Sequence, residues 1–220
     1  MKREEARALI QGIGILPSVR VNTQELARFA AETVYAAGIP VVEITLTVPG
    51  AVEVVNYLAE RYADMAVGAG TVLDEESARQ CVEAGARFLT SPGFVPEVVA
   101  YAKRKDVVVL PGALTPTEII AAWKAGSDFV KIFPTGNVGG FQYVRALKVP
   151  LPQIPLIATG GVNQLTASDY ILAGATAIGV GGELLPKEAL HFRQSDRIHE
   201  LAGRFLAMVR EARALRETYY

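Results

Sequence analysis

The 220-residue chain is half apolar and a fifth charged, and its net charge of −1 argues against nucleic acid or an anionic membrane as a partner. A single cysteine, Cys81, excludes an intramolecular disulfide framework and suits a reducing compartment. No apolar run approaches the ~20 residues of a membrane span and residues 1–5 lack a signal peptide's apolar core, so we expect a cytoplasmic protein.

Short apolar runs recur along the chain at regular intervals. Four of them follow directly on the dipeptide Ala-Gly, which is typical of a helix that ends in a glycine and turns into a strand. Three further apolar runs lie between these, and one more precedes them near the start of the chain. The sequence therefore predicts eight strands, spaced roughly 20–25 residues apart: 14–19, 39–44, 65–70, 86–90, 107–110, 128–134, 155–158 and 175–180.

The segments between the strands have the pattern of amphipathic helices. Each helix is predicted to begin near a residue of a type that caps helices or occupies their first position. These residues are Asn22 or Thr23, Pro49, Asp74, Pro96, Thr115 with Pro116, and Thr166. We expect an extra helix over 2–11 to cover the bottom of the fold and 193–217 to form the last helical layer.

Eight near-equal strand–helix units predict an α/β fold, a (β/α)8 TIM barrel with an N-terminal helix and few insertions, as a single domain over residues 1–220. A doubly wound open sheet is the alternative. The absence of a GxGxxG motif after the first strand argues against it.

One lysine interrupts the sixth predicted strand. Because side chains alternate along a strand, Lys131 shares a face with Phe129 and Phe133, while Val130 and Ile132 take the other face. Burial disfavours the charged form of a lysine, and a neutral amine is a nucleophile towards carbonyl groups. The alternative is a solvated lysine on an edge strand, where it protects the edge from aggregation.

Glu43 interrupts the second strand as Lys131 interrupts the sixth. Alternation places it on one face with Val41 and Thr45, and an inward face would bring its carboxylate towards the lysine. It would then be either one half of a structural salt bridge or a general acid/base beside an amine nucleophile.

Two glycine pairs follow the last two strands. Gly160-Gly161 and Gly181-Gly182 are expected to leave backbone N–H groups open at helix starts, where barrels often bind a phosphate or another anion. Arg20, at the end of the first strand, would assist if it turns inward. The alternative is that these glycines only form turns. No grouping of His, Cys, Asp and Glu has metal-ligand spacing.

Six short motifs, taken in order, cover nearly the whole chain: VEITL at 42–46, GAGTV at 68–72, SPG at 91–93, PG at 111–112, VKIFP at 130–134 and TGGV at 159–162. In this combination they resemble the bacterial class I aldolases of 2-keto-3-deoxy-6-phosphogluconate (KDPG) and 4-hydroxy-2-oxoglutarate (KHG). The resemblance implies a homotrimeric barrel that reversibly cleaves a 2-keto-4-hydroxy acid into pyruvate and an aldehyde, without metal or cofactor.

The resemblance also implies roles for individual residues. Lys131 would form a Schiff base with the keto carbon, and Glu43 would move protons, through a water. The substrate-binding residues would be Thr71 at the pyruvate carboxylate, Pro92 and Phe133 at the pocket walls, Thr159 at the hydroxyl of the cleaved bond, and Gly160, Gly161, Gly181 and Gly182 at the distal anion.

The chain departs from the KDPG pattern at two positions. Thr47 stands where relatives often carry an arginine that clamps the carboxylate, and Glu183 stands where a serine often follows the last glycine pair. An ionised Glu183 pointing into the glycine pairs would repel a phosphate, and one pointing outward as the first residue of the next helix would not. We therefore expect only a weak preference for phosphorylated substrates.

Two other classes of function remain open. A barrel isomerase or synthase of phosphorylated metabolites would share the glycine motifs but has no particular need of Lys131 beside Glu43. A non-catalytic pyruvate-binding module is the other.

Overall fold

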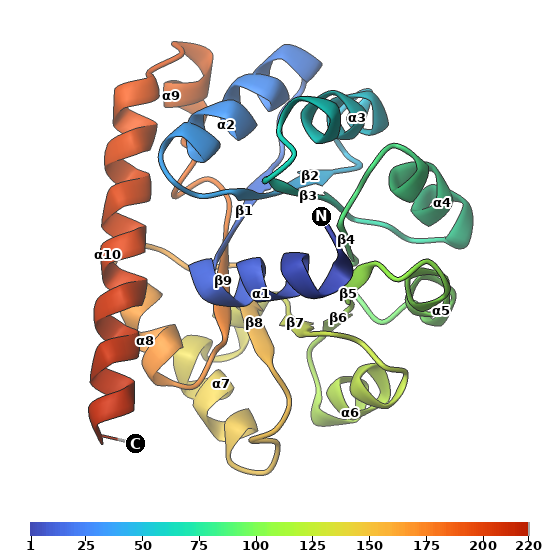
Figure 1. The fold of residues 1–220 in the computed structure, drawn as a ribbon. Helices are drawn as coiled ribbons and strands as arrows, with labels where there is room; N and C mark the ends of the chain where they lie inside the picture. Colours follow the sequence, from blue (N-terminus) through green and yellow to red (C-terminus); the bar gives the residue numbers. More distant parts are fainter. Residues whose placement is uncertain (220) are drawn as a thin grey trace.

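The computed structural model describes residues 1–219, in which one sheet of parallel strands is surrounded by helices (Figure 1). The strands follow one another in the order β5-β4-β3-β2-β1-β9-β8-β7-β6. Their bounds are β1 Ile15–Val19, β2 Val41–Thr45, β3 Ala66–Gly70, β4 Phe88–Thr90, β5 Val108–Leu110, β6 Gly112–Ala113, β7 Val130–Ile132, β8 Leu156–Thr159 and β9 Ala177–Val180.

The sheet closes on itself. Its first strand, β1, pairs in parallel with both β2 and the last strand, β9. Its two ends, β5 and β6, are separated by Pro111 alone, whose carbonyl still accepts a hydrogen bond from the backbone N–H of Lys131 at 2.9 Å. The two short strands therefore occupy the place of the single predicted fifth strand. The TIM-like barrel is confirmed, and the doubly wound alternative is wrong.

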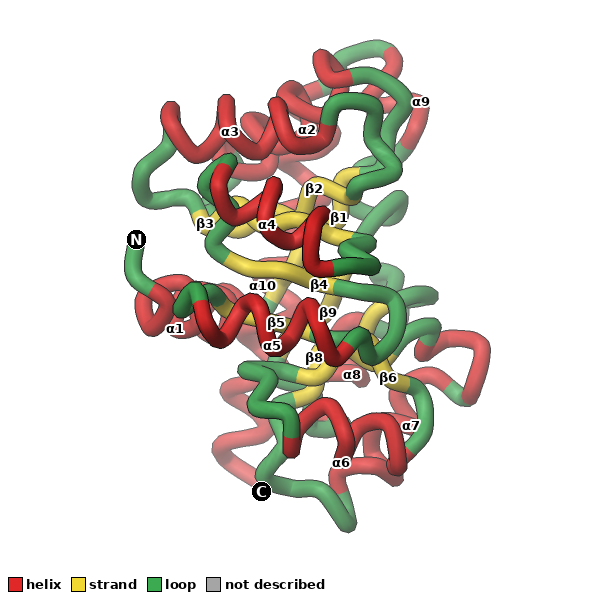
Figure 2. The backbone as a smooth tube through the Cα atoms, turned by 90° about the vertical axis from the view of Figure 1, so that its right-hand side faces the viewer, coloured by secondary structure: helices red, strands yellow, loops and turns green. Residues whose placement is uncertain are grey.

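The helices that follow β1 surround the barrel, and the helix before β1 lies across one of its ends, as the views from the end and side show (Figures 1 and 2). Their bounds are α1 Arg3–Ile13, α2 Gln24–Ala36, α3 Ala51–Arg61, α4 Glu75–Glu83, α5 Pro96–Arg104, α6 Pro116–Lys124, the 3-10 helix η1 Thr135–Val138, α7 Gly140–Lys148, α8 Ala167–Leu172, α9 Lys187–His191 and α10 Ser195–Tyr219. None of these helices is both long and apolar enough to cross a membrane.

Most of the predicted helix starts are confirmed. The side chains of Thr23, Asp74 and Thr115 each accept a hydrogen bond from a backbone N–H in the first turn of their helix. Pro96 opens α5, as expected of proline at a first helical position. Thr166 stands at the cap position of α8 but makes no capping hydrogen bond with its side chain.

Two separate apolar clusters show how alternation along the strands sorts the side chains. The inner cluster fills the barrel and includes Phe129, together with Ala6 and Ile10 of α1. The outer cluster lies between strands and helices and includes Val130 and Ile132. The predicted faces of the lysine strand are therefore confirmed, and α1 covers the amino-terminal end of the barrel.

A buried carboxylate ties α1 to the lysine strand. The side chain of Asp128, two residues before β7, accepts hydrogen bonds from the Arg3 guanidinium at 2.8 Å and the Val109 N–H at 2.9 Å. Burial raises the pKa of Asp128, while these two donors act in the opposite direction. The contact holds α1 against the amino-terminal end of the barrel.

Candidate active site

A cavity of about 1310 Å³ opens at the carboxyl-terminal ends of the strands. Such a position is where barrels of this kind carry their chemistry. Every residue for which the sequence predicted a role lines this cavity: Arg20, Glu43, Thr47, Thr71, Pro92, Lys131, Phe133, Thr159, Gly160, Gly161, Gly181 and Gly182. Residues from seven different strand ends are thereby brought together.

The lysine and the glutamate meet inside the barrel. Lys131 is 7% exposed and Glu43 is 2% exposed, and Lys131 Nζ lies 3.5 Å from Glu43 Oε2. The Lys131 Nζ also lies 5.7 Å from the centre of the Phe133 ring, which is on the same face of the strand. An amine and a carboxylate at this separation can exchange a proton and can both reach one bound molecule.

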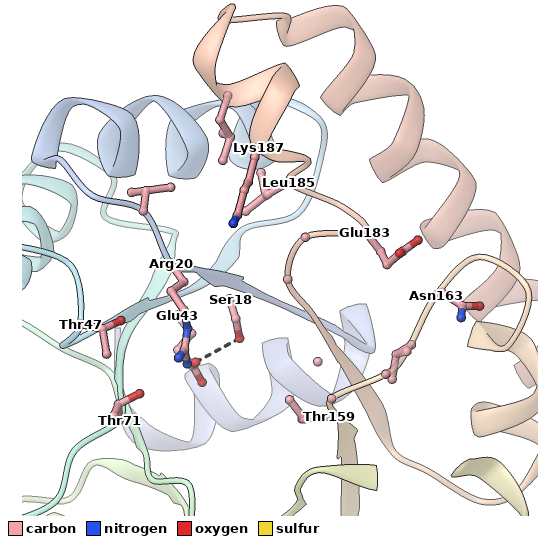
Figure 3. Close-up of a pocket in the computed structure, with 18 of the residues that line it drawn as sticks. Ser18, Arg20, Glu43, Thr47, Thr71, Thr159, Asn163, Glu183, Leu185 and Lys187 are labelled. Carbon is pink, nitrogen blue, oxygen red and sulfur yellow. Dashed lines mark hydrogen bonds between the residues drawn. The ribbon is translucent and has the colours of Figure 1, made fainter. Parts of the chain in front are cut away.

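Both oxygens of the Glu43 carboxylate accept a hydrogen bond from a hydroxyl group. Ser18 Oγ donates to Oε1 at 3.0 Å (Figure 3), and Thr90 Oγ1 donates to Oε2 at 2.6 Å. Thr90 Oγ1 also accepts a hydrogen bond from Lys131 Nζ at 3.4 Å. The carboxylate is therefore held in one orientation, facing the amine.

Two glycines make room for these side chains. A Cβ added at Gly70 would lie 2.5 Å from Oε1 of Glu43, and one added at Gly179 would lie 2.5 Å from Oγ1 of Thr159. Real Cβ atoms do not approach other atoms so closely, so these two positions need glycine.

The hydroxyl of Thr159 is unusual among the described side chains. It is buried, yet Oγ1 has no hydrogen-bond partner within residues 1–219. A buried polar group without a partner costs free energy, and such groups often await a ligand. Thr159 lines the cavity, so a molecule bound there lies beside this residue.

The threonines on the other side of the pocket are differently arranged. Figure 3 shows Thr47 and Thr71 on one side of Glu43 and Thr159 on the other. The Thr47 hydroxyl is hydrogen-bonded to that of Thr45 at 2.7 Å. Thr71 has a φ of 62°, a left-handed conformation that non-glycine residues seldom adopt and that is frequently found at functional sites.

The two glycine pairs do not stand at helix starts, and this part of the prediction is wrong. The helix that follows Gly160-Gly161 begins at Ala167, and the helix that follows Gly181-Gly182 begins at Lys187. Both pairs lie in turns instead. No hydrogen bond within residues 1–219 uses the backbone N–H of Gly161 or Gly182, so both amides remain available.

The acidic and the basic side chains near these turns point in different directions. Glu183 is exposed, lies in the turn rather than in the next helix, and points away from Arg20 and Lys187 (Figure 3). Lys187 points from the start of α9 towards the pocket, on the side where Arg20 lies. Neither cation is within 4.0 Å of a carboxylate oxygen in the described chain.

Ser18, Thr90 and Lys187 were not predicted from the sequence. Strand alternation carries a signal for the first two, because Ser18 is two residues after the inward-facing Leu16 of β1 and Thr90 is two residues after the inward-facing Phe88 of β4. Lys187 carries no such signal, because its direction depends on how α9 folds back over the pocket. Within residues 1–219 no three His, Cys, Asp or Glu side chains are grouped as metal ligands would be.

Comparison with known proteins agrees with this geometry. The model of the KDPG and KHG aldolase family matches residues 7–201. The KHG/KDPG aldolase of Escherichia coli is 31% identical over 201 residues, which are 91% of this chain and 94% of that protein. The KDPG aldolase of Legionella pneumophila, with pyruvate captured as a covalent carbinolamine, has a TM-score of 0.83 at 29% identity; the match covers 90% of this chain and 96% of that one.

Proposed function

Because the chain belongs to the KDPG and KHG aldolase family, we propose that it cleaves a 2-keto-3-deoxy sugar acid, its 6-phosphate or KHG through a Schiff base on Lys131. The products are pyruvate and an aldehyde: glyceraldehyde, glyceraldehyde 3-phosphate or glyoxylate. The observation that carries the proposal is the buried amine of Lys131, 3.5 Å from the buried carboxylate of Glu43.

The first stage joins the substrate to the enzyme. The Lys131 ammonium gives one proton to the Glu43 carboxylate, and the resulting neutral amine attacks the C2 carbonyl, so that an N–C bond forms and the carbonyl electrons move to oxygen. The Glu43 carboxyl protonates this oxygen to give the C2 hydroxyl. The Glu43 carboxylate then receives a second proton from the nitrogen and passes it to the C2 hydroxyl, which leaves as water. The result is a protonated imine, which can accept electrons.

The second stage breaks the carbon–carbon bond. The Glu43 carboxylate takes the proton of the C4 hydroxyl, the C3–C4 bond breaks, and its electron pair moves into the imine to give an enamine. The aldehyde leaves, the Glu43 carboxyl protonates C3, and water releases pyruvate from Lys131. That hydrolysis returns two protons from water to the nitrogen, so Glu43 ends as the carboxylate and Lys131 as the ammonium with which the cycle began.

The substrate-binding roles follow from the positions of the pocket residues. Thr71 and Thr47 lie where they can donate hydrogen bonds to the pyruvate carboxylate, with Pro92 and Phe133 as apolar walls. The unpartnered hydroxyl of Thr159 meets the C4 hydroxyl of the substrate.

The far end of the substrate lies at the two turns formed by Gly160, Gly161, Gly181 and Gly182. The free backbone N–H groups of Gly161 and Gly182 donate hydrogen bonds to a carboxylate or phosphate oxygen there, and Arg20 and Lys187 supply positive charge. The expectation of a weak phosphate preference rested on Glu183 facing this site. Glu183 lines the cavity, but its carboxylate points away from the two cations, so we propose that the phosphorylated and the unphosphorylated acids are both accepted.

The assembly that we propose is a homotrimer, as in the sequence-based expectation. Large apolar side chains are available at the surface for such contacts, among them Leu165 at 89% exposure and Val149 at 78%. A cytoplasmic location stays a prediction.

An assay of pyruvate release tests the proposed function. The purified chain is incubated with KDPG, its unphosphorylated form or KHG, and pyruvate is measured through lactate dehydrogenase. We expect turnover of at least one acid and its loss in Lys131→Arg, because a guanidinium stays protonated and cannot attack a carbonyl. The matched control is Lys124→Arg on the exposed face of α6, which retains activity.

Two outcomes would contradict the proposal: no pyruvate from any of the three acids, or full activity in Lys131→Arg. The first is the result expected of a barrel isomerase or synthase, whose chemistry releases no pyruvate.

A further inference from the structure

The hydroxyl of Thr90 lies between the two groups that the proposed reaction uses. Thr90 is the last residue of β4, is 0% exposed, and faces the barrel interior two residues after Phe88. A buried threonine on an otherwise apolar strand needs a hydrogen-bond partner. This one has two, and both are proposed participants in the chemistry.

The geometry places Thr90 in a chain of hydrogen bonds from amine to carboxylate. Lys131 Nζ donates to Thr90 Oγ1 at 3.4 Å, and Thr90 Oγ1 donates to Glu43 Oε2 at 2.6 Å. Direct contact between Nζ and Oε2 is an ion pair at 3.5 Å. Among residues 1–219, Thr90 is the only residue that accepts a hydrogen bond from Nζ.

We propose that Thr90, on the function proposed above, relays protons between Lys131 and Glu43. When the amine has attacked the C2 carbonyl, an N–H bond breaks and its proton moves to Thr90 Oγ1. In the same step the original hydroxyl proton of Thr90 passes to Glu43 Oε2. The threonine ends neutral, the nitrogen has lost one proton, and the carboxylate has gained one.

The competing interpretation is that Thr90 only holds the carboxylate. Ser18 provides the comparison, because its hydroxyl also donates to Glu43, at 3.0 Å to Oε1, but makes no hydrogen bond with Lys131. Removing either hydroxyl deletes one hydrogen bond to the same carboxylate. Only the removal of Thr90 also interrupts the path to the amine.

The test measures how fast the Schiff base forms. Enzyme and pyruvate are mixed rapidly and quenched with borohydride at increasing times, and label on Lys131 is measured by mass spectrometry. We expect Thr90→Val to slow labelling by about 10- to 100-fold. We expect the labelling rate of Thr90→Ser to stay within about threefold of the wild type, since this variant keeps the hydroxyl. We expect Ser18→Ala to label at least about ten times faster than Thr90→Val.

A second measurement uses only the wild-type protein and does not depend on how Thr90→Val folds. The labelling rate is measured in mixtures of H2O and D2O. If two protons move together, a plot of this rate against the deuterium fraction is curved. If one proton moves, the dependence is linear.

Equal slowing by Thr90→Val and Ser18→Ala, or a linear dependence on deuterium, would overturn the relay while leaving the aldolase proposal intact. Absence of label on the wild-type enzyme would overturn the proposed function, and the relay with it.

Discussion

At the scale of single residues, the site depends on two ionisable groups that the barrel keeps away from water. Removing Lys131 and Glu43 from water costs several kcal/mol per charge, and their mutual attraction offsets this only in part. A hydrophobic pair would fill the same space more favourably. What the ionisable pair offers is a proton that can move between an amine and a carboxylate, and the proposed chemistry needs this at every step.

Glu43→Gln removes the proton acceptor and keeps the shape of the side chain. We expect kcat for pyruvate release to fall by about 10²- to 10⁴-fold, as is typical for loss of a general base. Pyruvate should still bind, because its proposed carboxylate contacts come from Thr71 and Thr47. Activity within about threefold of the wild type would mean that Glu43 is structural and that another group moves the protons.

Lys187→Ala tests the charge at the far end of the pocket. We expect kcat/KM for KDPG to fall about threefold to tenfold, since a partly exposed ion pair contributes on the order of 1 kcal/mol, and that for the unphosphorylated acid to stay unchanged. Lys124→Ala, an exposed lysine that does not line the cavity, is the matched control. An equal fall for both acids would show that Lys187 does not recognise the phosphate.

The sequence alone was sufficient to identify ionisable residues that stand in otherwise apolar strands. Lys131 and Glu43 interrupt apolar strands, and this made them visible. Ser18 and Thr90 are compatible with any half-polar strand, so their hydrogen bonds to Glu43 appear only when the four strands β1 to β4 are arranged in the curved sheet.

At the scale of elements, strand alternation was a reliable guide, because a strand has only two faces and one of them must fill the barrel. Loop geometry was not. Gly161 and Ala167 are separated by a turn in which Asn163 Oδ1 accepts hydrogen bonds from Leu165 N and Thr166 Oγ1. These local bonds delay the helix, and the sequence pattern does not distinguish such a turn from an immediate helix start.

Gly70→Ala is a test of how an element shapes the site. The new Cβ would lie 2.5 Å from Glu43 Oε1 and 2.7 Å from Glu43 Cγ, so the buried Glu43 side chain has to shift as a whole. We therefore expect a loss of about 1–3 kcal/mol of unfolding free energy, as is typical of overpacking, together with a fall in kcat of at least about tenfold. The measurements are urea unfolding and the pyruvate assay.

The control for this variant is Gly203→Ala on α10, where a Cβ would meet nothing within 4 Å. It should leave activity unchanged and stabilise the helix by about 0.5–1 kcal/mol. Full activity in Gly70→Ala would contradict the placement of the Glu43 carboxylate against β3.

At the scale of the whole molecule, the number and spacing of the strand–helix units were enough to predict the barrel. The closing contact was not visible in any local pattern, because β1 and β9 lie at opposite ends of the chain. The split of the fifth strand at Pro111 was also not predicted. It follows from the missing N–H of proline, which interrupts the regular hydrogen bonding of a strand.

Light scattering coupled to size exclusion tests the proposed trimer. We expect a molar mass about three times the 23.6 kDa of the chain, independent of concentration in the micromolar range. A stable monomer at those concentrations would contradict the proposed assembly and would leave the chemistry within one barrel unaffected.

Reduction of the proposed Schiff base tests the central claim most directly. The protein is incubated with saturating pyruvate and sodium borohydride, digested with trypsin, and analysed by mass spectrometry. Modification of Lys131 prevents cleavage after it, so we predict one reduced pyruvyl group on a peptide spanning residues 125–145, and no such adduct in Lys131→Arg. Label on a different lysine, or an unlabelled protein at saturating pyruvate, would contradict the account.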